Sequence, residues 1–151
     1  MPCVQVHSGE RLRTTRRLFR EYARDIGVDL CFQGFEQELA ELPGRYAPPD
    51  GNLLLALHGR VPVGCVALRK IGDGVCEMKR LYVRPRFRRT GMGRKLAEAI
   101  IDSARRLGYA RMRLDTLASL KPAIALYESL GFYRIRPYYH NPLGNVVFLE
   151  R

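Results

Sequence analysis

A basic turn that contains two glycines, at residues 86–95, constrains the fold of this chain more than any other stretch. Apolar residues in the preceding segment, 75–85, are spaced as in a β-strand, whereas those of 92–107 recur every three or four positions, as on one face of a helix. The turn itself holds four arginines and one lysine around Gly91 and Gly93. Because like charges repel at this density, the turn is typical of a site that receives an anion.

The rest of the chain also changes between strand and helix patterns. Predicted strands cover 4–7, 53–59, 61–71, 75–85, 110–116, 133–139 and 146–151, and predicted helices cover 9–27, 35–42, 92–107 and 119–131. The three strands within 53–85 follow one another through short turns, which favours an antiparallel arrangement. There is no internal repeat or linker, so we expect a single domain, residues 1–151, of the mixed α/β class.

The strand before the basic turn changes its alternation partway along. Cys76 and Met78 are apolar at even positions, whereas Leu81 and Val83 are apolar at odd ones. Since side chains of a strand point alternately to its two faces, either both faces are buried or one extra residue near 79–80 forms a β-bulge. We favour the bulge, which would move this strand away from its next neighbour and free backbone groups for a ligand.

Positive charge is concentrated in one part of the sequence. The chain has 26 Lys and Arg against 15 Asp and Glu, a formal net charge of +11. Residues 79–111 hold eleven of the basic residues and two acids, a net of +9. This favours a polyphosphate or nucleic-acid ligand over a merely solvated basic face. Nucleic-acid binding is the weaker of the two, because it would spread the arginines along a face with exposed aromatic residues.

The cysteines and the apolar segments predict where the protein works. None of the four cysteines has the spacing of a zinc site, and we expect all of them to be reduced, with no metal site. No apolar run is long enough to span a membrane, and the first residues lack the apolar core of a signal peptide. We therefore expect a cytoplasmic protein.

The start of the third predicted helix is suited to binding phosphate. The first N–H groups of a helix have no acceptor within the helix, and the helix dipole adds partial positive charge there. Gly91 and Gly93 leave the backbone accessible, and Arg88, Arg89 and Arg94 would supply charge-assisted hydrogen bonds. The pattern matches neither the Walker motif nor the dinucleotide-binding motif.

Two motifs resemble those of the GNAT N-acetyltransferases. The sequence "RRTGMG" at 88–93 is similar to their R/Q-x-x-G-x-G/A signature, and "MKRLYVRPRFR" at 78–88 resembles the strand before it. The sequence "AIALYESLGF" at 123–132 resembles their second signature, about thirty residues downstream. The resemblance covers nearly the whole chain. It implies a mostly antiparallel central sheet of about seven strands with about four helices and a splayed central strand.

The resemblance also implies acetyl-CoA as the acyl donor. The pyrophosphate would lie on the backbone of the turn, and the pantetheine arm would pair with the splayed strand. The implied donor-binding residues are Leu81, Tyr82, Val83, Arg88, Arg89, Thr90, Gly91, Met92, Gly93 and Arg94.

Acetyl transfer to an amine needs a neutral nucleophile, a stabilised carbonyl oxygen and a proton for the departing thiolate. By the resemblance, Tyr127 is the general acid, and Glu77 is the candidate general base. The alternatives are a packed helix tyrosine and an ion pair of Glu77 with Lys79 or Arg80. Leu120 stands where the family often has asparagine, and Asp115 and Thr116 could supply the missing hydrogen bond.

The acceptor is less defined than the donor. Aromatic residues of the first two helices and the last hairpin would form a closed, partly apolar pocket for a small molecule, unless they serve only in packing: Tyr22, Phe32, Tyr46, Tyr138, Tyr139 and His140. The predicted reaction is transfer of the acetyl group to a primary amine of a small molecule or amino acid, by direct attack in a ternary complex. An acetyl-CoA sensor without catalysis is the second interpretation, and a homodimer is one option for the assembly.

Overall fold

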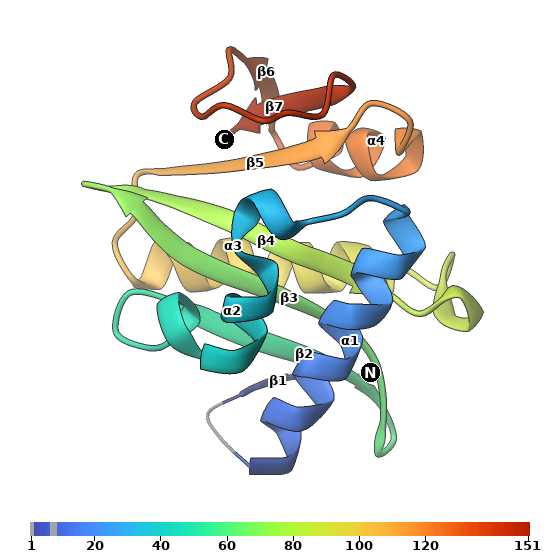
Figure 1. Ribbon diagram of the computed structural model, residues 1–151. Helices are drawn as coiled ribbons and strands as arrows, with labels where there is room; N and C mark the ends of the chain where they lie inside the picture. The colour runs from blue at the N-terminus through green and yellow to red at the C-terminus, as the bar shows by residue number, and fades with distance from the viewer. Residues whose placement is uncertain (1, 7–8) are drawn as a thin grey trace.

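A seven-stranded sheet with helices on both faces forms the body of the protein. The computed structural model describes residues 2–6 and 9–151, and the strand order is β1-β2-β3-β4-β5-β7-β6 (Figure 1). The strands are β1 (Cys3–Gln5), β2 (Asn52–His58), β3 (Val61–Gly72), β4 (Val75–Val83), β5 (Arg111–Leu117), β6 (Tyr133–Ile135) and β7 (Val146–Glu150). The α-helices are α1 (Gly9–Ile26), α2 (Phe35–Glu41), α3 (Met92–Arg106) and α4 (Lys121–Ser129), and three short 3-10 turns cover 31–33, 44–46 and 85–87.

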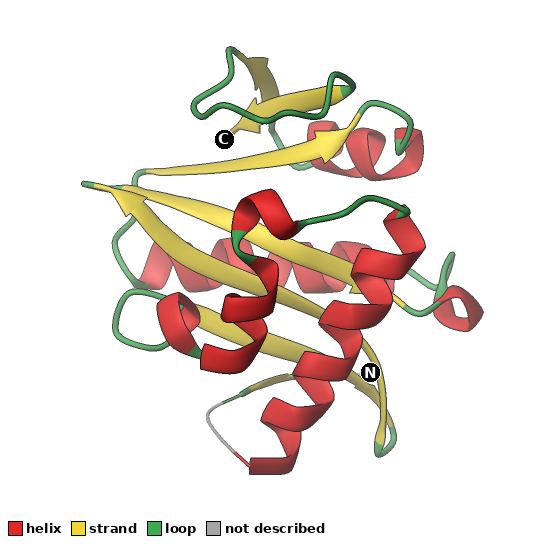
Figure 2. Cartoon of the chain, in the orientation of Figure 1, coloured by secondary structure: helices red, strands yellow, loops and turns green. Residues whose placement is uncertain are grey.

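The predicted fold class is confirmed. Strands β2, β3 and β4 are successive antiparallel neighbours, and β6 and β7 form the predicted terminal hairpin. The pairing of β4 with β5 is parallel, as expected of two strands joined by a crossover helix, here α3. The element boundaries are shown in Figure 2.

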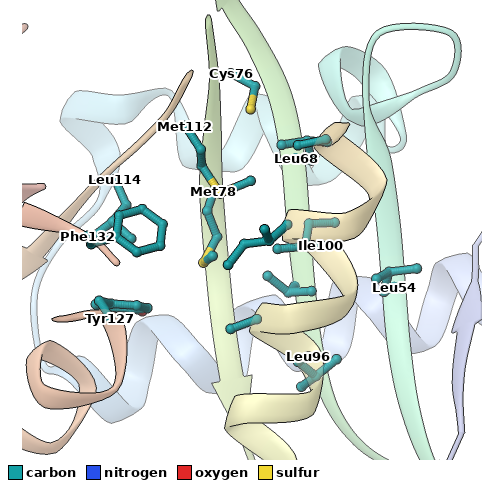
Figure 3. Close-up of a cluster of buried hydrophobic side chains, with 14 of the residues drawn as sticks. Leu54, Leu68, Cys76, Met78, Leu96, Ile100, Met112, Leu114, Tyr127 and Phe132 are labelled. Carbon is teal, nitrogen blue, oxygen red and sulfur yellow. The ribbon is translucent and has the colours of Figure 1, made fainter. Parts of the chain in front are cut away.

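The helices cover the two faces of the sheet in pairs. In Figure 1, α1 and α2 lie in front of the sheet and α3 lies behind it. The core on the α3 side includes Met78, Leu96, Ile100 and Tyr127, which Figure 3 shows around the central strands. A second core, between the sheet and the helices α1 and α2, includes Phe19 among its buried residues. Both faces of the central strands are thus buried.

A β-bulge lies in β4 where the alternation of apolar residues predicts it. Cys65 pairs with Tyr82 and Ala67 with Lys79, so two steps along β3 match three along β4. Arg80 has a φ of 60°, a left-handed conformation that is uncommon for residues other than glycine. The bulge lets the apolar residues on either side of it, Met78 and Leu81, contribute to the same core.

The central strands also splay, as predicted. β4 pairs with β5 over three residues only, ending at Glu77 opposite Arg113. Beyond that point β5 continues in register with β7, from Arg113 to Leu117. The ribbons of β4 and β5 diverge from that end in Figure 1. The edge of β4 from Met78 to Val83 that faces β5 therefore has no strand partner.

Several boundaries differ from the predictions, among them the following three. The first strand covers 3–5 rather than 4–7, and residue 7 lies outside the described residues. Strand β6 ends at Ile135 rather than 139, because Pro137 cannot donate to the sheet. The N-cap of α4 is Leu120, without a side-chain hydrogen bond, rather than Ser119. Pro122 lies in the first turn and has no N–H group. The start of α4 therefore has one backbone donor fewer that needs a capping acceptor.

Candidate active site

The turn between β4 and α3 presents a row of unpaired backbone N–H groups. Arg89 and Gly91 have left-handed conformations, with φ of 64° and 82°. In the described part of the chain, no hydrogen bond joins the N–H groups of residues 89–94 to a protein acceptor. A Cβ built on Gly91 would meet no atom within 4 Å, so the space before the helix is open. Such a turn can hold a phosphate group.

The arginines around this turn have different partners. Arg88 donates to the carbonyl oxygen of Val83 and to Asp25 of α1, both at 2.9 Å. Arg94 donates to Ser129 at 2.6 Å, and the Thr90 hydroxyl donates to the carbonyl oxygen of Phe87 at 2.6 Å. Arg89 is exposed. The Arg88 and Arg94 side chains thus brace the turn against α1 and α4.

A cleft of about 70 Å³ lies where β4 separates from β5. Its lining comes from both faces of the sheet: Tyr22, Gln33, Lys79 and Asp115 from the α1 and α2 side, and Met78, Leu114, Ala123 and Tyr127 from the other. Leu81 and Leu120 also line it. We call this cleft the splay cleft. It is lined from both faces of the sheet.

Tyr127 of α4 is placed in the splay cleft. Its side chain is only 7% exposed and packs edge-on against Phe132, at 5.8 Å between ring centroids. Figure 3 shows both rings beside Leu114. Burial raises the pKa of the Tyr127 hydroxyl, and nearby Tyr22 and Asp115 raise it further. Because its pKa is raised, the hydroxyl is neutral, and it has no hydrogen-bond partner among the described residues.

Glu77 lies outside the splay cleft. It is 1% exposed, and each of its carboxylate oxygens accepts a hydrogen bond: Oε1 from Arg69 at 2.8 Å and Oε2 from the hydroxyl of Tyr138. The predicted alternative, an ion pair with Lys79 or Arg80, is wrong. Arg69, directly opposite Glu77 on β3, is its ion-pair partner, and Arg80 pairs with Glu38 of α2 instead.

Lys79 and Asp115 are the charged groups that face each other in the splay cleft. Lys79 Nζ lies 3.7 Å from Asp115 Oδ1 and donates to Oε1 of Gln33 at 3.1 Å. The hydroxyl of Tyr139 donates to Asp115 Oδ2 at 2.6 Å. Asp115 Oδ1 accepts no hydrogen bond in the described part of the chain. Burial lowers the pKa of Lys79, and the neighbouring Arg80 charge lowers it further.

Sequence reasoning missed Lys79 and Gln33 as residues of the site. Lys79 belongs to the basic stretch 79–111, and the alternation of side chains after Met78 turns it toward the helices α1 and α2. Gln33 lies in the irregular segment between those helices, where no pattern signals a role. Of the predicted aromatic residues, Tyr22 lines the splay cleft, whereas Tyr138 and Tyr139 hold the carboxylates of Glu77 and Asp115.

Neither a metal site nor a membrane-spanning helix is present among the described residues. Among residues 2–6 and 9–151 there is no cluster of potential ligands that could hold a metal ion. The same residues include no helix long and apolar enough to cross a membrane. Cys3, Cys65 and Cys76 are free thiols, and burial raises the pKa of Cys76 to about 12.

Comparisons with known proteins agree with this geometry. The sequence model of the acetyltransferase (GNAT) family matches residues 14–132. An uncharacterized N-acetyltransferase of Schizosaccharomyces pombe is 47% identical over 138 residues, which cover 89% of this chain and 84% of that protein. A [ribosomal protein bS18]-alanine N-acetyltransferase of Escherichia coli is 50% identical over 81 residues, covering 54% of this chain and 53% of that one.

Solved structures share the fold. The PaiA N-acetyltransferase of Thermoplasma acidophilum, crystallised in complex with coenzyme A, superposes with a TM-score of 0.73 at 19% identity, covering 100% of this chain and 99% of that one. The family match spans most of the chain and includes the basic turn, the splay cleft and Tyr127. The chain therefore belongs to the acetyltransferase (GNAT) family and is an enzyme of the acyltransferase class.

Proposed function

We propose that this protein transfers an acetyl group from acetyl-CoA to a primary amine of a small molecule or amino acid, by direct attack in a ternary complex. The observation that carries the proposal is the row of unpaired N–H groups at residues 89–94, next to a cleft that crosses the sheet beside Tyr127. A diphosphate fits that turn, and a structural relative was crystallised with coenzyme A.

The donor would be held by the turn and by the free edge of β4. Backbone N–H groups from Arg89 to Arg94 would receive the phosphates, with Arg88 bracing the turn from behind. The unpaired edge from Leu81 to Val83 would pair with the amide groups of the pantetheine arm, with the backbone N–H of Leu81 a candidate partner for the carbonyl oxygen. Acetyl-CoA supplies the acetyl group as a thioester.

Two side chains of the splay cleft suit the proton transfers. A lysine-like amine has a pKa near ~10.4, so at neutral pH it must lose a proton before it can attack. Asp115 offers an oxygen without a hydrogen bond, whereas both oxygens of Glu77 are occupied. We therefore place the proton acceptor at Asp115 and give Glu77 a positioning role through Tyr138. Tyr127, neutral in the cleft, would donate its proton to the departing sulfur.

The donor site is tested by ligand-induced stabilisation. Acetyl-CoA that binds the folded state alone should raise the Tm of the wild type. Gly91→Val should abolish that rise for two reasons. Valine at a φ of 82° strains the turn, and its methyl groups would occupy the open space proposed for the phosphates. Gly72→Ala, on the loop end of β3 where a Cβ meets nothing closer than 3.9 Å, is the control and should keep the rise. A wild-type Tm that acetyl-CoA leaves unchanged would remove the proposal.

The assignment of the proton acceptor is tested by a pair of variants. Asp115→Asn should lower kcat by roughly 10²-fold or more at neutral pH, with acetyl-CoA binding retained. Glu77→Gln preserves the shape of the side chain and should reduce kcat less than Asp115→Asn does. A larger loss of kcat in Glu77→Gln, in a variant that still binds acetyl-CoA, would return the role of the base to Glu77.

Catalysis is distinguished from sensing by Tyr127→Phe. The variant retains the ring that packs against Phe132 and loses only the hydroxyl, so we expect acetyl-CoA binding to persist while CoA release falls. Unchanged turnover would remove Tyr127 from the mechanism. Acetyl-CoA binding by the wild type without CoA release to any amine would favour the sensor.

A further inference from the structure

The splay cleft contains two oppositely charged side chains, Lys79 and Asp115, that are not hydrogen-bonded to each other. Lys79 and Asp115 are 4% and 11% exposed, and their 3.7 Å separation allows an ion pair but exceeds the length of a hydrogen bond. Among the described residues Lys79 donates one hydrogen bond, to Gln33, of the three that an ammonium group can donate. Asp115 keeps Oδ1 without a donor among the described residues. Each group can therefore take a further partner of opposite charge.

The other charged groups nearby do not supply those partners. Arg80 also lines the splay cleft, but Glu38 holds its guanidinium through two hydrogen bonds of 2.9 and 3.0 Å. The carboxylate of Glu77 is occupied by Arg69 and Tyr138. A buried cation whose counterion lies 3.7 Å away is only partly compensated, and a bound anion would offset the remaining cost.

We propose that the acceptor is a free α-amino acid, held with its carboxylate on Lys79 and its amino group at Asp115. The inference rests on the proposed function, because the amine at Asp115 is the nucleophile. In an α-amino acid, the positive ammonium group and the negative carboxylate group are both attached to the same carbon atom. Beside the Lys79–Asp115 pair, such an amino acid would complete a ring of four charges that alternate in sign. No two groups of like charge would be neighbours in this ring.

The transfer balances with the groups that are present. Asp115 takes a proton from the ammonium group of the amino acid, and the freed nitrogen forms a bond to the carbonyl carbon of the acetyl group. The carbon–sulfur bond breaks, and the sulfur takes a proton from Tyr127. The nitrogen, now part of the amide, gives up its second proton, which restores the Tyr127 hydroxyl. The carboxylate stays on Lys79 throughout, so Lys79 is a specificity residue rather than an acid or a base.

There is also room for a side chain. A hollow of about 200 Å³ lies between α2, the 44–46 turn and β3, and Gln33 borders both this hollow and the splay cleft. Its lining includes the polar side chains of Gln37, Glu38 and Arg69 as well as apolar surface. A polar side chain of the bound amino acid would find partners there.

The experiment compares matched acceptors with matched variants. Each amino acid of a panel is assayed beside its decarboxylated amine, its α-amide and a dipeptide that begins with it, by CoA release. Lys79→Met removes the charge and keeps an unbranched side chain, and Lys70→Met, at an exposed lysine on β3, is the control. Thermal shift by acetyl-CoA checks that every variant folds and binds the donor, and thermal shift by the amino acid in the presence of CoA reports its binding.

We expect the wild type and Lys70→Met to prefer at least one amino acid over its amine, amide and dipeptide by roughly 100-fold or more in kcat/KM. Lys79→Met should lose this preference through a higher KM for the amino acid, and its loss of kcat/KM should be smaller with the decarboxylated amine than with the amino acid. A wild type that acetylates amides or dipeptides as readily as free amino acids would overturn the inference alone, as would a Lys79→Met variant that keeps the preference. If none of the acceptors led to CoA release, the proposed function would be overturned as well.

Discussion

Arg80 shows how a single residue links the bulge to the acceptor side of the sheet. It has a φ of 60° and a side chain that is 2% exposed, paired with Glu38 and stacked over the ring of Phe35 at 5.1 Å. A left-handed conformation costs an ordinary residue roughly 1–2 kcal/mol. The ion pair and the ring contacts that follow from the bulge offset that cost, and they fix α2 against β4.

Substitution of Arg80 should therefore be much more damaging than substitution of Arg89. Both residues have left-handed φ values, 60° and 64°. Replacement by alanine should therefore change the backbone contribution to the free energy of unfolding by a similar amount in the two variants. Arg80→Ala leaves Glu38 buried without its partner and should lower the free energy of unfolding by about 3–5 kcal/mol. Arg89→Ala, at an exposed site, should change it by about 0.5 kcal/mol or less. Urea unfolding measures both, and equal losses would show that the cost lies in the backbone.

At the scale of elements, α1 is attached to the end of β4 by one ion pair. Glu21 of α1 accepts two hydrogen bonds from the guanidinium of Arg84, at 2.8 and 2.9 Å, and Arg84 also donates to the carbonyl oxygen of Pro62. The hydrogen bond from Arg84 lowers the pKa of the Glu21 carboxyl below its ordinary 4.5. The pair holds α1 over the strand that carries the donor edge.

The pH dependence of this contact has a definite sign. Because the folded-state pKa of Glu21 is lowered, the stabilisation is present in full above pH 4.5 and is lost as the pH falls through the folded-state value. Both side chains are about a quarter exposed, so Glu21→Gln should cost about 1 kcal/mol at pH 7. The difference in Tm from the wild type should shrink at pH 3. Glu36→Gln, in an exposed pair with Arg20, should show little difference at either pH.

Elements set by local patterns were predictable from the sequence, and those set by distant contacts were not. The parity change between Cys76–Met78 and Leu81–Val83 predicted the bulge, because alternation along a strand is a local property. The partners of the carboxylates depend on how the last hairpin folds over the sheet. Tyr138 reaches Glu77 across 61 positions in the sequence, and no local pattern records that contact. Sequence motifs thus pointed to the basic turn and to Tyr127 as site residues, which stay predictions, and left the acceptor side open.

At the scale of the whole molecule, the splay cleft crosses the sheet and separates two approaches to one point. The donor turn precedes α3, which covers one face, whereas Lys79, Gln33 and Tyr22 line the cleft from the side of α1 and α2. This arrangement is consistent with the proposed ternary complex. The residues that line the cleft include no cysteine, and the two buried cysteines have pKa values raised by burial. An acetylated cysteine is not expected between the two substrates.

Initial rates should reflect this arrangement. We expect double-reciprocal plots with acetyl-CoA and the acceptor varied together to intersect, as for a ternary complex, rather than to run parallel. Acetyl-CoA alone should release no burst of CoA, and intact-protein mass spectrometry should find no added acetyl group after that incubation. Parallel plots together with an acetylated protein that passes its acetyl group to the acceptor would show that the two substrates use the cleft in turn. In that case the two faces of the sheet would not be occupied at once, and the splay would serve only to admit the donor.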